Sequence, residues 1–166
     1  FLIEDNAAEA ELLAQTAGAQ MELTRVSSLA QAVRAASGSQ FDVALLDLSL
    51  PDSSGLETVR LALSWLGELP VIVLTGHDST LLGLEAVRAG AQDYLVKGKA
   101  DADTILRAVR YAIERARVRR ELQQFNERLE ATVRQRTAEL AQTVDALKVE
   151  VEQRLDAEQA LRKSNE

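Results

Sequence analysis

The chain has 166 residues, enough for one ordinary domain with an attached element that builds no core of its own. It contains no cysteine, which excludes a disulfide scaffold and a thiolate metal site and fits a reducing compartment. No window approaches the roughly 20 apolar residues of a membrane span. We therefore expect a soluble, cytoplasmic protein that makes no use of a membrane.

The formal charge of −7 is unevenly distributed. Residues 1–113 carry 8 Lys and Arg against 15 Asp and Glu, whereas residues 114–166 carry 11 of each. An acidic first part argues against direct nucleic-acid binding. The neutral remainder is typical of a helix with internal salt bridges and not of a basic arm.

Both prolines and all eight glycines lie at or before Gly98, and residues 99–166 contain neither. Since these two residue types interrupt regular structure most strongly, the sequence divides into a turn-rich globular part and a long uninterrupted helix.

Five short apolar runs in the first part predict strands. They are Phe1-Ile3, Met21-Val26, Val43-Leu46, Val71-Leu74 and Asp93-Val96. Helical spacing separates them, with capping boxes expected at Asn6, Ser28 and Ser54 and further caps at Ser79 and Asp101. Five repeats of strand then helix predict an α/β fold, in which helices cover both faces of a parallel sheet. Because Phe1 already reads as strand interior, we expect that residues precede it in the natural protein.

Beyond Asp101 the apolar residues form one stripe at helical spacing. Its first part, at residues 105–113, suits packing on the sheet, and its later members are Leu122, Phe125, Leu129, Val133, Leu140, Val144, Leu147, Val151 and Leu161. A lone helix cannot bury this later stripe, so we expect a coiled coil over residues 118–166. The eleven residues from Leu129 to Leu140 indicate a local phase shift between two heptad registers. Arg136, Arg154 and Glu158 lie near the seam and would weaken the pairing there.

Chemically active side chains follow four of the five predicted strands. Glu4 and Asp5 follow the first strand, Asp47 the third, Thr75 the fourth and Lys97 the fifth. Because the carboxyl ends of parallel strands meet at one edge, these groups are expected to form one site. Three carboxylates repel one another unless a hard cation such as Mg²⁺ lies among them. A carboxylate can also attack a phosphoryl group to give an acyl phosphate.

These residues fit distinct roles in such a site. Asp47 is the best placed nucleophile and Asp5 the best metal ligand, while Lys97 and Thr75 suit the charged phosphoryl oxygens. Gly76 leaves the backbone beside Thr75 accessible. Each residue alone has an ordinary interpretation, as a turn, a cap or a solvated side chain. Together, at the correct ends of the correct strands, they indicate one site.

Four motifs, I-E-D-N, L-L-D-L-S-L-P-D-S-S-G, V-I-V-L-T-G and D-Y-L-V-K-G, occur in this order. Their order and spacing closely resemble the receiver domain of two-component response regulators, over roughly residues 1–117. The resemblance implies a flavodoxin-like (βα)5 sheet with strand order 2-1-3-4-5. It also implies Mg²⁺-dependent (or Mn²⁺-dependent) transfer of a phosphoryl group to Asp47 from a histidine kinase or phosphotransfer protein. The implied metal ligands are Asp5, Asp47 and the backbone carbonyl of Ser49, with Glu4 acting through water.

The resemblance further implies a conformational switch. Thr75 would move towards the phosphoryl group and Tyr94 would change rotamer, altering the surface of the fourth helix, fifth strand and fifth helix. Gly98 departs from the family, which usually has a proline after the lysine, often with a cis bond. A cis bond before a non-proline residue costs about 2.5–4 kcal/mol, so the geometry of this loop stays open. His77 is interpreted either as an exposed loop residue or as a modulator of autodephosphorylation.

The tail, from E-R-L-E-A-T-V-R-Q-R-T-A-E-L to A-L-R-K-S-N-E, is similar to the signalling helices that connect receivers to other domains. A simple dimerisation helix is the alternative, and both interpretations imply a homodimer through residues 118–163. We expect an output domain after Glu166.

Two other functions stay open for the first part. One is an aspartate-nucleophile phosphohydrolase, which would carry a second aspartate two residues after the nucleophile, where this chain has Ser49. The other is a dimerising scaffold that is never phosphorylated. The leading hypothesis is a phosphorylatable signalling module and not an enzyme. The sequence shows neither a glycine-rich ATP segment nor a helical phosphoacceptor histidine, so we do not expect it to autophosphorylate from ATP as a kinase would.

Overall fold

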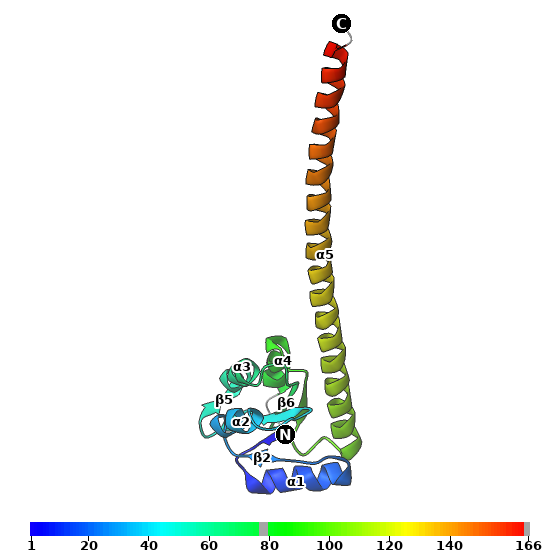
Figure 1. Cartoon of the computed structure of the whole chain (residues 1–166). Coiled ribbons are helices and arrows are strands. Elements are labelled where there is room, and N and C mark those ends of the chain that lie inside the picture. The colour runs from blue at the N-terminus through cyan, green and yellow to red at the C-terminus, as the bar shows by residue number, and fades with distance from the viewer. Residues whose placement is uncertain (77–79, 165–166) are drawn as a thin grey trace. The chain divides into compact units, whose positions relative to one another are not determined.

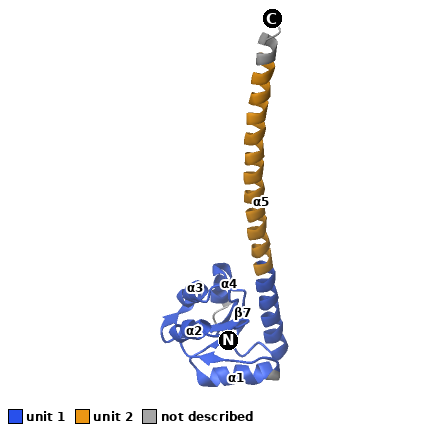
Figure 2. Ribbon diagram, viewed as in Figure 1, with its two compact units in different colours: residues 1–119 blue, residues 120–166 orange. Residues whose placement is uncertain are grey.

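The structure, a computed structural model, describes residues 1–76 and 80–164. The chain divides into two compact units, Phe1–Arg119 and Arg120–Glu166, which Figure 2 shows in different colours. The first unit contains every strand of the described residues.

A five-stranded parallel sheet forms the centre of the first unit, with strand order β2-β1-β3-β6-β7 (Figure 1). Its strands are β1 (Leu2–Ile3), β2 (Arg25–Val26), β3 (Ala44–Asp47), β6 (Val71–Thr75) and β7 (Asp93–Val96). Numbered along the chain within this sheet, the order is 2-1-3-4-5. The predicted α/β fold and strand order are therefore confirmed.

Two details of the strands differ from the prediction. Strand β2 begins at Arg25 and not at Met21, because it lies at the edge and pairs only with the two residues of β1. A short hairpin, β4 (Ser49–Leu50) and β5 (Ser53–Ser54), follows β3 and was not predicted. Strands of two residues are too short to show an apolar period.

Five α-helices connect and follow the strands. They are α1 (Ala7–Ala17), α2 (Leu29–Ala36), α3 (Gly55–Trp65), α4 (Thr80–Ala89) and α5 (Ala102–Ser164), with a short 3₁₀ turn η1 (Gly18–Gln20) after α1.

Most of the predicted helix caps are present. The side chains of Asn6, Ser28 and Asp101 each accept a hydrogen bond from a backbone amide in the first turn that follows. Ser54 occupies the N-cap position of α3, but its side chain accepts no such bond, so that part of the prediction is wrong. Ser79 lies outside the described residues.

Two apolar clusters hold the sheet between its helices. Within β3, Ala44 and Leu46 belong to a cluster with α2, α3 and α4, whereas Leu45 belongs to a cluster with α1 and the start of α5. Successive strand residues point to opposite faces, so one buried strand supplies both clusters. This packing holds the strand ends, and the side chains that follow them, in fixed positions.

The second unit has no such core within the described residues. Every described side chain from Arg117 to Gln159 is exposed. Among the helices that the structure describes, α5 included, none has the length and apolar character needed to cross a membrane.

Candidate functional site

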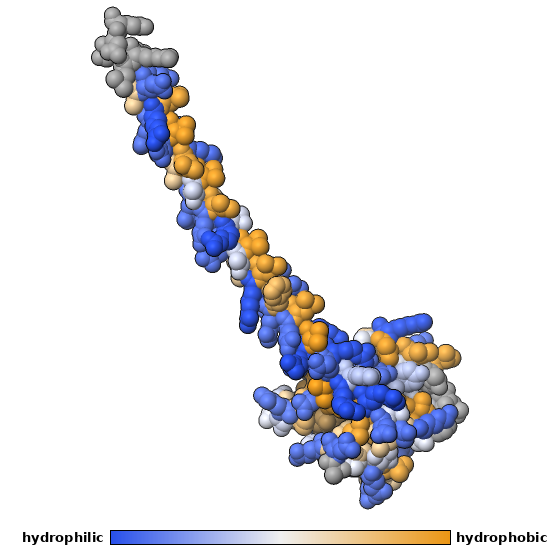
Figure 3. All heavy atoms as spheres, turned by 90° about the vertical axis from the view of Figure 1, so that its right-hand side faces the viewer, coloured by the Kyte–Doolittle hydropathy of each residue, from blue (hydrophilic) through white to orange (hydrophobic). Residues whose placement is uncertain are grey.

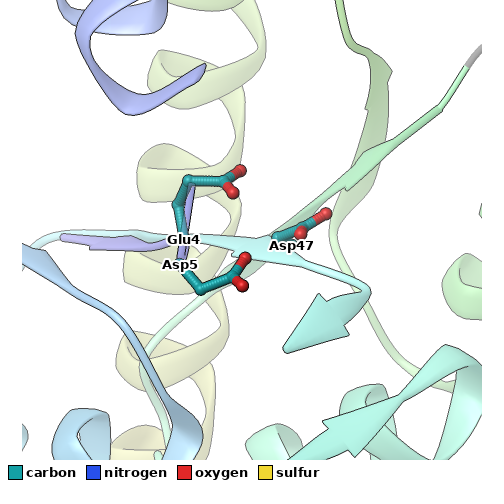
Figure 4. Close-up of side chains that lie close together, drawn as sticks. All are labelled: Glu4, Asp5 and Asp47. Atoms are coloured by element: carbon teal, nitrogen blue, oxygen red, sulfur yellow. The ribbon is translucent and has the colours of Figure 1, made fainter. Parts of the chain in front are cut away.

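Three carboxylates meet at the carboxyl edge of the sheet (Figure 4). Strands β1 and β3 pair with Ile3 opposite Leu46, so the residues that follow, Glu4 and Asp47, are brought side by side. One oxygen each of Glu4, Asp5 and Asp47 lies within 4.8 Å of the other two. Glu4 and Asp47 are buried and Asp5 is exposed. The structure thus brings together the three predicted acidic residues.

Lys97 supplies the positive charge of this cluster. Its Nζ lies 2.8 Å from Asp47 Oδ1, 2.7 Å from Glu4 Oε2 and 2.6 Å from Glu9 Oε2. The lysine directly follows β7, and its backbone amide donates to the carbonyl of Thr75 on the neighbouring strand. Lys97 therefore lies in one cluster with Glu4 and Asp47, as expected from the strand ends, and it also pairs with Glu9.

Burial and hydrogen bonding act in opposite directions on these charges. Burial alone would lower the pKa of Lys97, but hydrogen bonds from Nζ to Asp47, Glu4 and Glu9 outweigh it and raise the pKa. For Glu4, burial has the largest effect and raises the pKa, and the nearby Asp47 charge adds to it; the hydrogen bond and charge of Lys97 and the amide of Asn6 lower the pKa but do not outweigh burial. Lys97 consequently stays an ammonium at neutral pH, which a group that stabilises phosphoryl oxygens requires.

Thr75 and Gly76 lie at the carboxyl end of β6, the strand next to β3 in the sheet. Thr75 ends β6, is buried and donates from Oγ1 to the carbonyl of Leu95 at 3.4 Å. Gly76 follows in open surroundings, since a Cβ built there would meet nothing within 4 Å. His77 lies outside the described residues.

Tyr94 is half-buried and packs against α4. A Cβ built on Gly83 would lie 2.4 Å from Cδ2 of the Tyr94 ring, so only glycine fits under the ring in this position. Tyr94 was predicted as a site residue, whereas Gly83 was not.

The loop that follows Asp47 is held at several points. The amide of Leu48 donates to Asp47 Oδ1 at 2.9 Å, and the amide of Gly55 donates to the carbonyl of Leu48 at 2.8 Å. The Asp52 carboxylate accepts from the amides of Leu29 and Ala30, at the beginning of α2. The loop is therefore tied to a second helix besides the one that follows it.

The geometry of the loop after Lys97, which the sequence left open, is defined in the structure. The Lys97–Gly98 peptide bond is trans, and Gly98 has a φ of 74°. Glycine adopts this left-handed conformation without a steric penalty, which accounts for glycine where the family usually has proline.

Three residues around the site were missed by sequence reasoning. Arg25 donates from Nε to the carbonyl of Glu4 at 2.8 Å and from Nη2 to the carbonyl of Asp5 at 2.5 Å. Glu9 pairs with Lys97 and Asp52 with α2, as described above. Only Glu9 had a sequence signal, the capping box that begins at Asn6.

The donor chemistry of the site suits a small divalent cation. Mg²⁺ binds oxygen ligands and is held in proteins by one or two carboxylates with water and substrate oxygens. Glu4, Asp5 and Asp47 offer three carboxylate oxygens close together. The residues present therefore fit a Mg²⁺ ion.

Known proteins resemble this chain in both sequence and fold. The family model of the response regulator receiver domain matches residues 1–110. The chain is 37% identical over 100 residues to the DNA-binding transcriptional activator DevR/DosR of Mycobacterium tuberculosis, covering 58% of this chain and 46% of that protein. It is 33% identical over 123 residues to the C4-dicarboxylate transport transcriptional regulatory protein DctD of Rhizobium meliloti, covering 71% of this chain and 26% of that protein. This chain thus spans less than half the length of these two relatives.

Solved structures show the same fold at lower identity. The receiver domain of NtrX from Brucella abortus has a TM-score of 0.61 and 23% identity, over 68% of this chain and 96% of that one. A structure described as adenylate cyclase from Rhodopirellula baltica has a TM-score of 0.65 and 22% identity, over 76% of this chain and 94% of that one. The family model matches two thirds of the sequence and the solved structures have the same fold, so the chain belongs to the response regulator receiver family of two-component systems.

Proposed function

We propose that this receiver accepts a phosphoryl group on Asp47 from a histidine kinase or phosphotransfer protein, in the presence of Mg²⁺ or Mn²⁺. The observation that carries the proposal is the position of the buried Asp47 carboxylate, within 4.8 Å of the other two acidic groups and 2.8 Å from the Lys97 ammonium. In the transfer, an Asp47 oxygen forms a bond to phosphorus as the bond from phosphorus to the donor nitrogen breaks. The donor nitrogen keeps the electron pair.

The chain's own residues would hold the ion and the reacting group. Asp5, Asp47 and the Ser49 carbonyl would bind Mg²⁺, and Glu4 would support it through water. A bound Mg²⁺ supplies positive charge that offsets the charge on the phosphoryl oxygens. Lys97 is held as an ammonium 2.8 Å from Asp47 Oδ1, and after transfer its N–H groups would donate to a phosphoryl oxygen.

Thr75 and Tyr94 would change position in response to the negative charge of the phosphoryl group on Asp47. The Thr75 hydroxyl donates to Leu95 at 3.4 Å, a long bond that a phosphoryl oxygen can replace. Movement of Thr75 would open space for the Tyr94 ring to leave its position against Gly83. Gly76 would give backbone access to the phosphoryl group and His77 would modulate its hydrolysis.

We further propose that a second copy of the chain covers α5 beyond residue 117. Large apolar side chains form a stripe along this helix (Figure 3) and are all between 48% and 65% exposed. The stripe repeats every eleven residues. One series is Val118, Leu129, Leu140 and Val151, and a second series, four residues later, is Leu122, Val133, Val144 and Leu155.

This regular repeat favours pairing of identical helices. The eleven-residue spacing from Leu129 to Leu140 continues along the stripe in both directions. A third series contains Phe125 and Leu147 but has Arg136 between them. A shift of eleven residues would place Arg136 against one of these apolar side chains, whereas an in-register pair places it opposite its own copy. Eleven residues in three turns favour a nearly straight, slightly right-handed pair.

The other functions find less support. A phosphohydrolase of this kind needs an acid or base two residues after Asp47, and that residue, Ser49, carries a hydroxyl in β4. We infer a signalling module and not an enzyme, with any catalysis or DNA binding belonging to an output domain. A scaffold that is never phosphorylated remains an outcome of the experiment below.

The phosphoacceptor proposal is tested by labelling the full chain with a small phosphodonor and Mg²⁺. We expect one acid-labile phosphoryl group per chain, and none on Asp47→Asn. Asp42→Asn is the matched control, because Asp42 is exposed and lies ahead of the same strand β3. Labelling that persists in Asp47→Asn would overturn the assignment of the nucleophile.

The second-copy proposal is tested by sedimentation and by crosslinking. The chain has no cysteine, so a single Val144→Cys substitution provides a unique thiol in the stripe. A parallel in-register pair would form a Val144→Cys disulfide on oxidation, whereas Gln142→Cys, away from the stripe, would not. A monomer at high micromolar concentration would overturn the proposal, and a dimer without the disulfide would overturn the parallel register.

A further inference from the structure

Glu9, in the first turn of α1, contacts the site although it does not lie at a strand end. Lys97 has three N–H donors, and they contact Glu4, Asp47 and Glu9 at 2.7, 2.8 and 2.6 Å. Glu9 is separated from Lys97 by 88 positions in the sequence. One of the three N–H groups of Lys97 therefore contacts Glu9, a carboxylate that is not a candidate metal ligand.

The cap of α1 determines where Glu9 points. Asn6 Nδ2 donates to Glu9 Oε1 at 3.1 Å, and the Glu9 amide donates back to Asn6 Oδ1 at 3.4 Å. With Oε1 held in this way, Oε2 is the oxygen that meets Lys97. The contact between the Asn6 and Glu9 side chains thus also presents a fixed negative charge to Lys97.

The position of Glu9 bears on how tightly the acidic cluster binds a cation. Lys97 and a divalent cation compete for the same oxygens, since both are attracted to Glu4 and Asp47. A carboxylate that engages Lys97 from the α1 side reduces that competition. The negative charge of Glu9 also attracts the cation directly. Because the Glu9 side chain is only 44% exposed, water screens this attraction only in part. Both effects act in the same direction.

We propose that Glu9 is a positioning residue that shares the Lys97 ammonium with Asp47 and Glu4, weakens its competition for their oxygens and so raises the affinity of the site for a divalent cation. This rests on the proposed function only in taking Mg²⁺ as the ion. Glu9 touches neither the ion ligands nor the phosphoryl acceptor, and acts through Lys97.

The test is a calorimetric titration of the unphosphorylated full chain with MgCl₂ at constant ionic strength. Glu9→Gln keeps an oxygen for Asn6 but removes the charge, and we expect its Mg²⁺ dissociation constant to rise about three- to tenfold. Glu11→Gln is the matched control, because Glu11 lies on the same helix, carries the same charge and bonds only to Gln15 among the contacts described. We expect its dissociation constant to stay within about twofold of the wild-type value.

A second variant and a second measurement separate positioning from structure. Glu9→Asp keeps the charge but shortens the reach to Lys97, so its dissociation constant should lie between those of wild type and Glu9→Gln. Thermal unfolding in EDTA should be the same for Glu9→Gln and Glu11→Gln. Equal Mg²⁺ affinities for Glu9→Gln and Glu11→Gln, or no Mg²⁺ binding by the wild type, would overturn the inference.

The outcome is independent of the phosphoacceptor test. Weakened Mg²⁺ binding in Glu9→Gln, in a chain that takes no phosphoryl label, would support the role of Glu9 while overturning the proposed function. Normal labelling with unchanged Mg²⁺ affinity in Glu9→Gln would support the proposed function and overturn the role of Glu9.

Discussion

The two units of the chain use apolar residues in opposite ways. In Phe1–Arg119 the residues of β3 and β6 are all buried, and helices cover both faces of the sheet. In Arg120–Glu166 equally large apolar side chains are present, yet all the described ones are exposed. The first unit completes its core from its own chain and can therefore hold charged groups in fixed positions. The second unit leaves its described apolar side chains exposed, which is the reason for proposing that a second copy covers them.

The largest expected effect distinguishes a core leucine from a stripe leucine. Leu46 is 0% exposed and Leu140 is 65% exposed. Leu46→Ala should lower the free energy of unfolding of the first unit by about 2–5 kcal/mol, because it leaves a cavity in the sheet. Leu140→Ala should change the same transition by less than about 0.5 kcal/mol and instead weaken association.

Urea denaturation followed by tryptophan fluorescence can measure this pair of variants. Trp65 is the only tryptophan and ends α3, so its emission reports the first unit alone. Equal losses of stability in both variants would show that the two units are not energetically distinct.

The next effect concerns packing at the proposed switch. Gly83→Ala places a methyl group 2.4 Å from the Tyr94 ring and should cost about 1–3 kcal/mol as overpacking, or drive the ring to another rotamer. In a Tyr94→Ala background the same change should instead stabilise the protein by up to about 1 kcal/mol, because alanine favours a helix over glycine.

A double-mutant cycle by urea denaturation measures this reversal of sign. Gly38→Ala is the control, since a Cβ there meets nothing within 4 Å. A destabilising Gly83→Ala in both backgrounds would contradict the contact between Gly83 and Tyr94.

The sequence predicted the sheet well because its central strands are continuous apolar runs. Residues 71–74 were expected as a strand, and β6 contains them together with Thr75, all buried. The edge strand β2 was predicted, but with a start at Met21 that proved too early, and the hairpin β4–β5 was not predicted, since two-residue strands leave no apolar period in the sequence. The long helix was predictable from the absence of glycine and proline after Gly98.

Some contacts of the site could likewise be predicted from sequence and others could not. Glu4, Asp47 and Lys97 were predictable because topology alone brings the carboxyl ends of parallel strands together. The contacts of Lys97 with Glu9 and of Asp52 with α2 span 88 and 23 positions and depend on where individual side chains point. Sequence patterns describe elements and their faces, and carry no information on such side-chain directions.

A smaller effect is expected where the loop after Asp47 meets α2. Burial acts to raise the pKa of Asp52, but hydrogen bonds from the amides of Ala30 and Leu29 outweigh it and lower the pKa. Asp52→Ala should destabilise the first unit by about 1 kcal/mol, as expected for losing a helix cap. Asp52→Asn should lose less, because an asparagine side chain still accepts hydrogen bonds.

The pH dependence of this loss follows from the direction of the shift. A lowered pKa in the folded state means that ionised Asp52 stabilises the fold above the ordinary aspartate value, and that this stabilisation disappears as the pH falls through the lowered value. The difference in unfolding free energy between wild type and Asp52→Asn should therefore be constant near neutral pH and shrink in acid. A difference that grows as the pH falls would contradict the contact.

The smallest effect is expected for ion pairs on the second unit, where exposure is greatest. Arg134 and Glu130 lie 3.4 Å apart with side chains 82% and 70% exposed. Glu130→Gln should change the helix content of the full chain by the equivalent of less than about 0.5 kcal/mol, because water screens the pair and ordering two long side chains offsets their attraction. Circular dichroism at low and high salt measures this, and the small difference should vanish at high salt. A larger, salt-independent loss would mean that Glu130 is buried in the assembled protein, and the surface that the second copy covers would then extend beyond the apolar stripe.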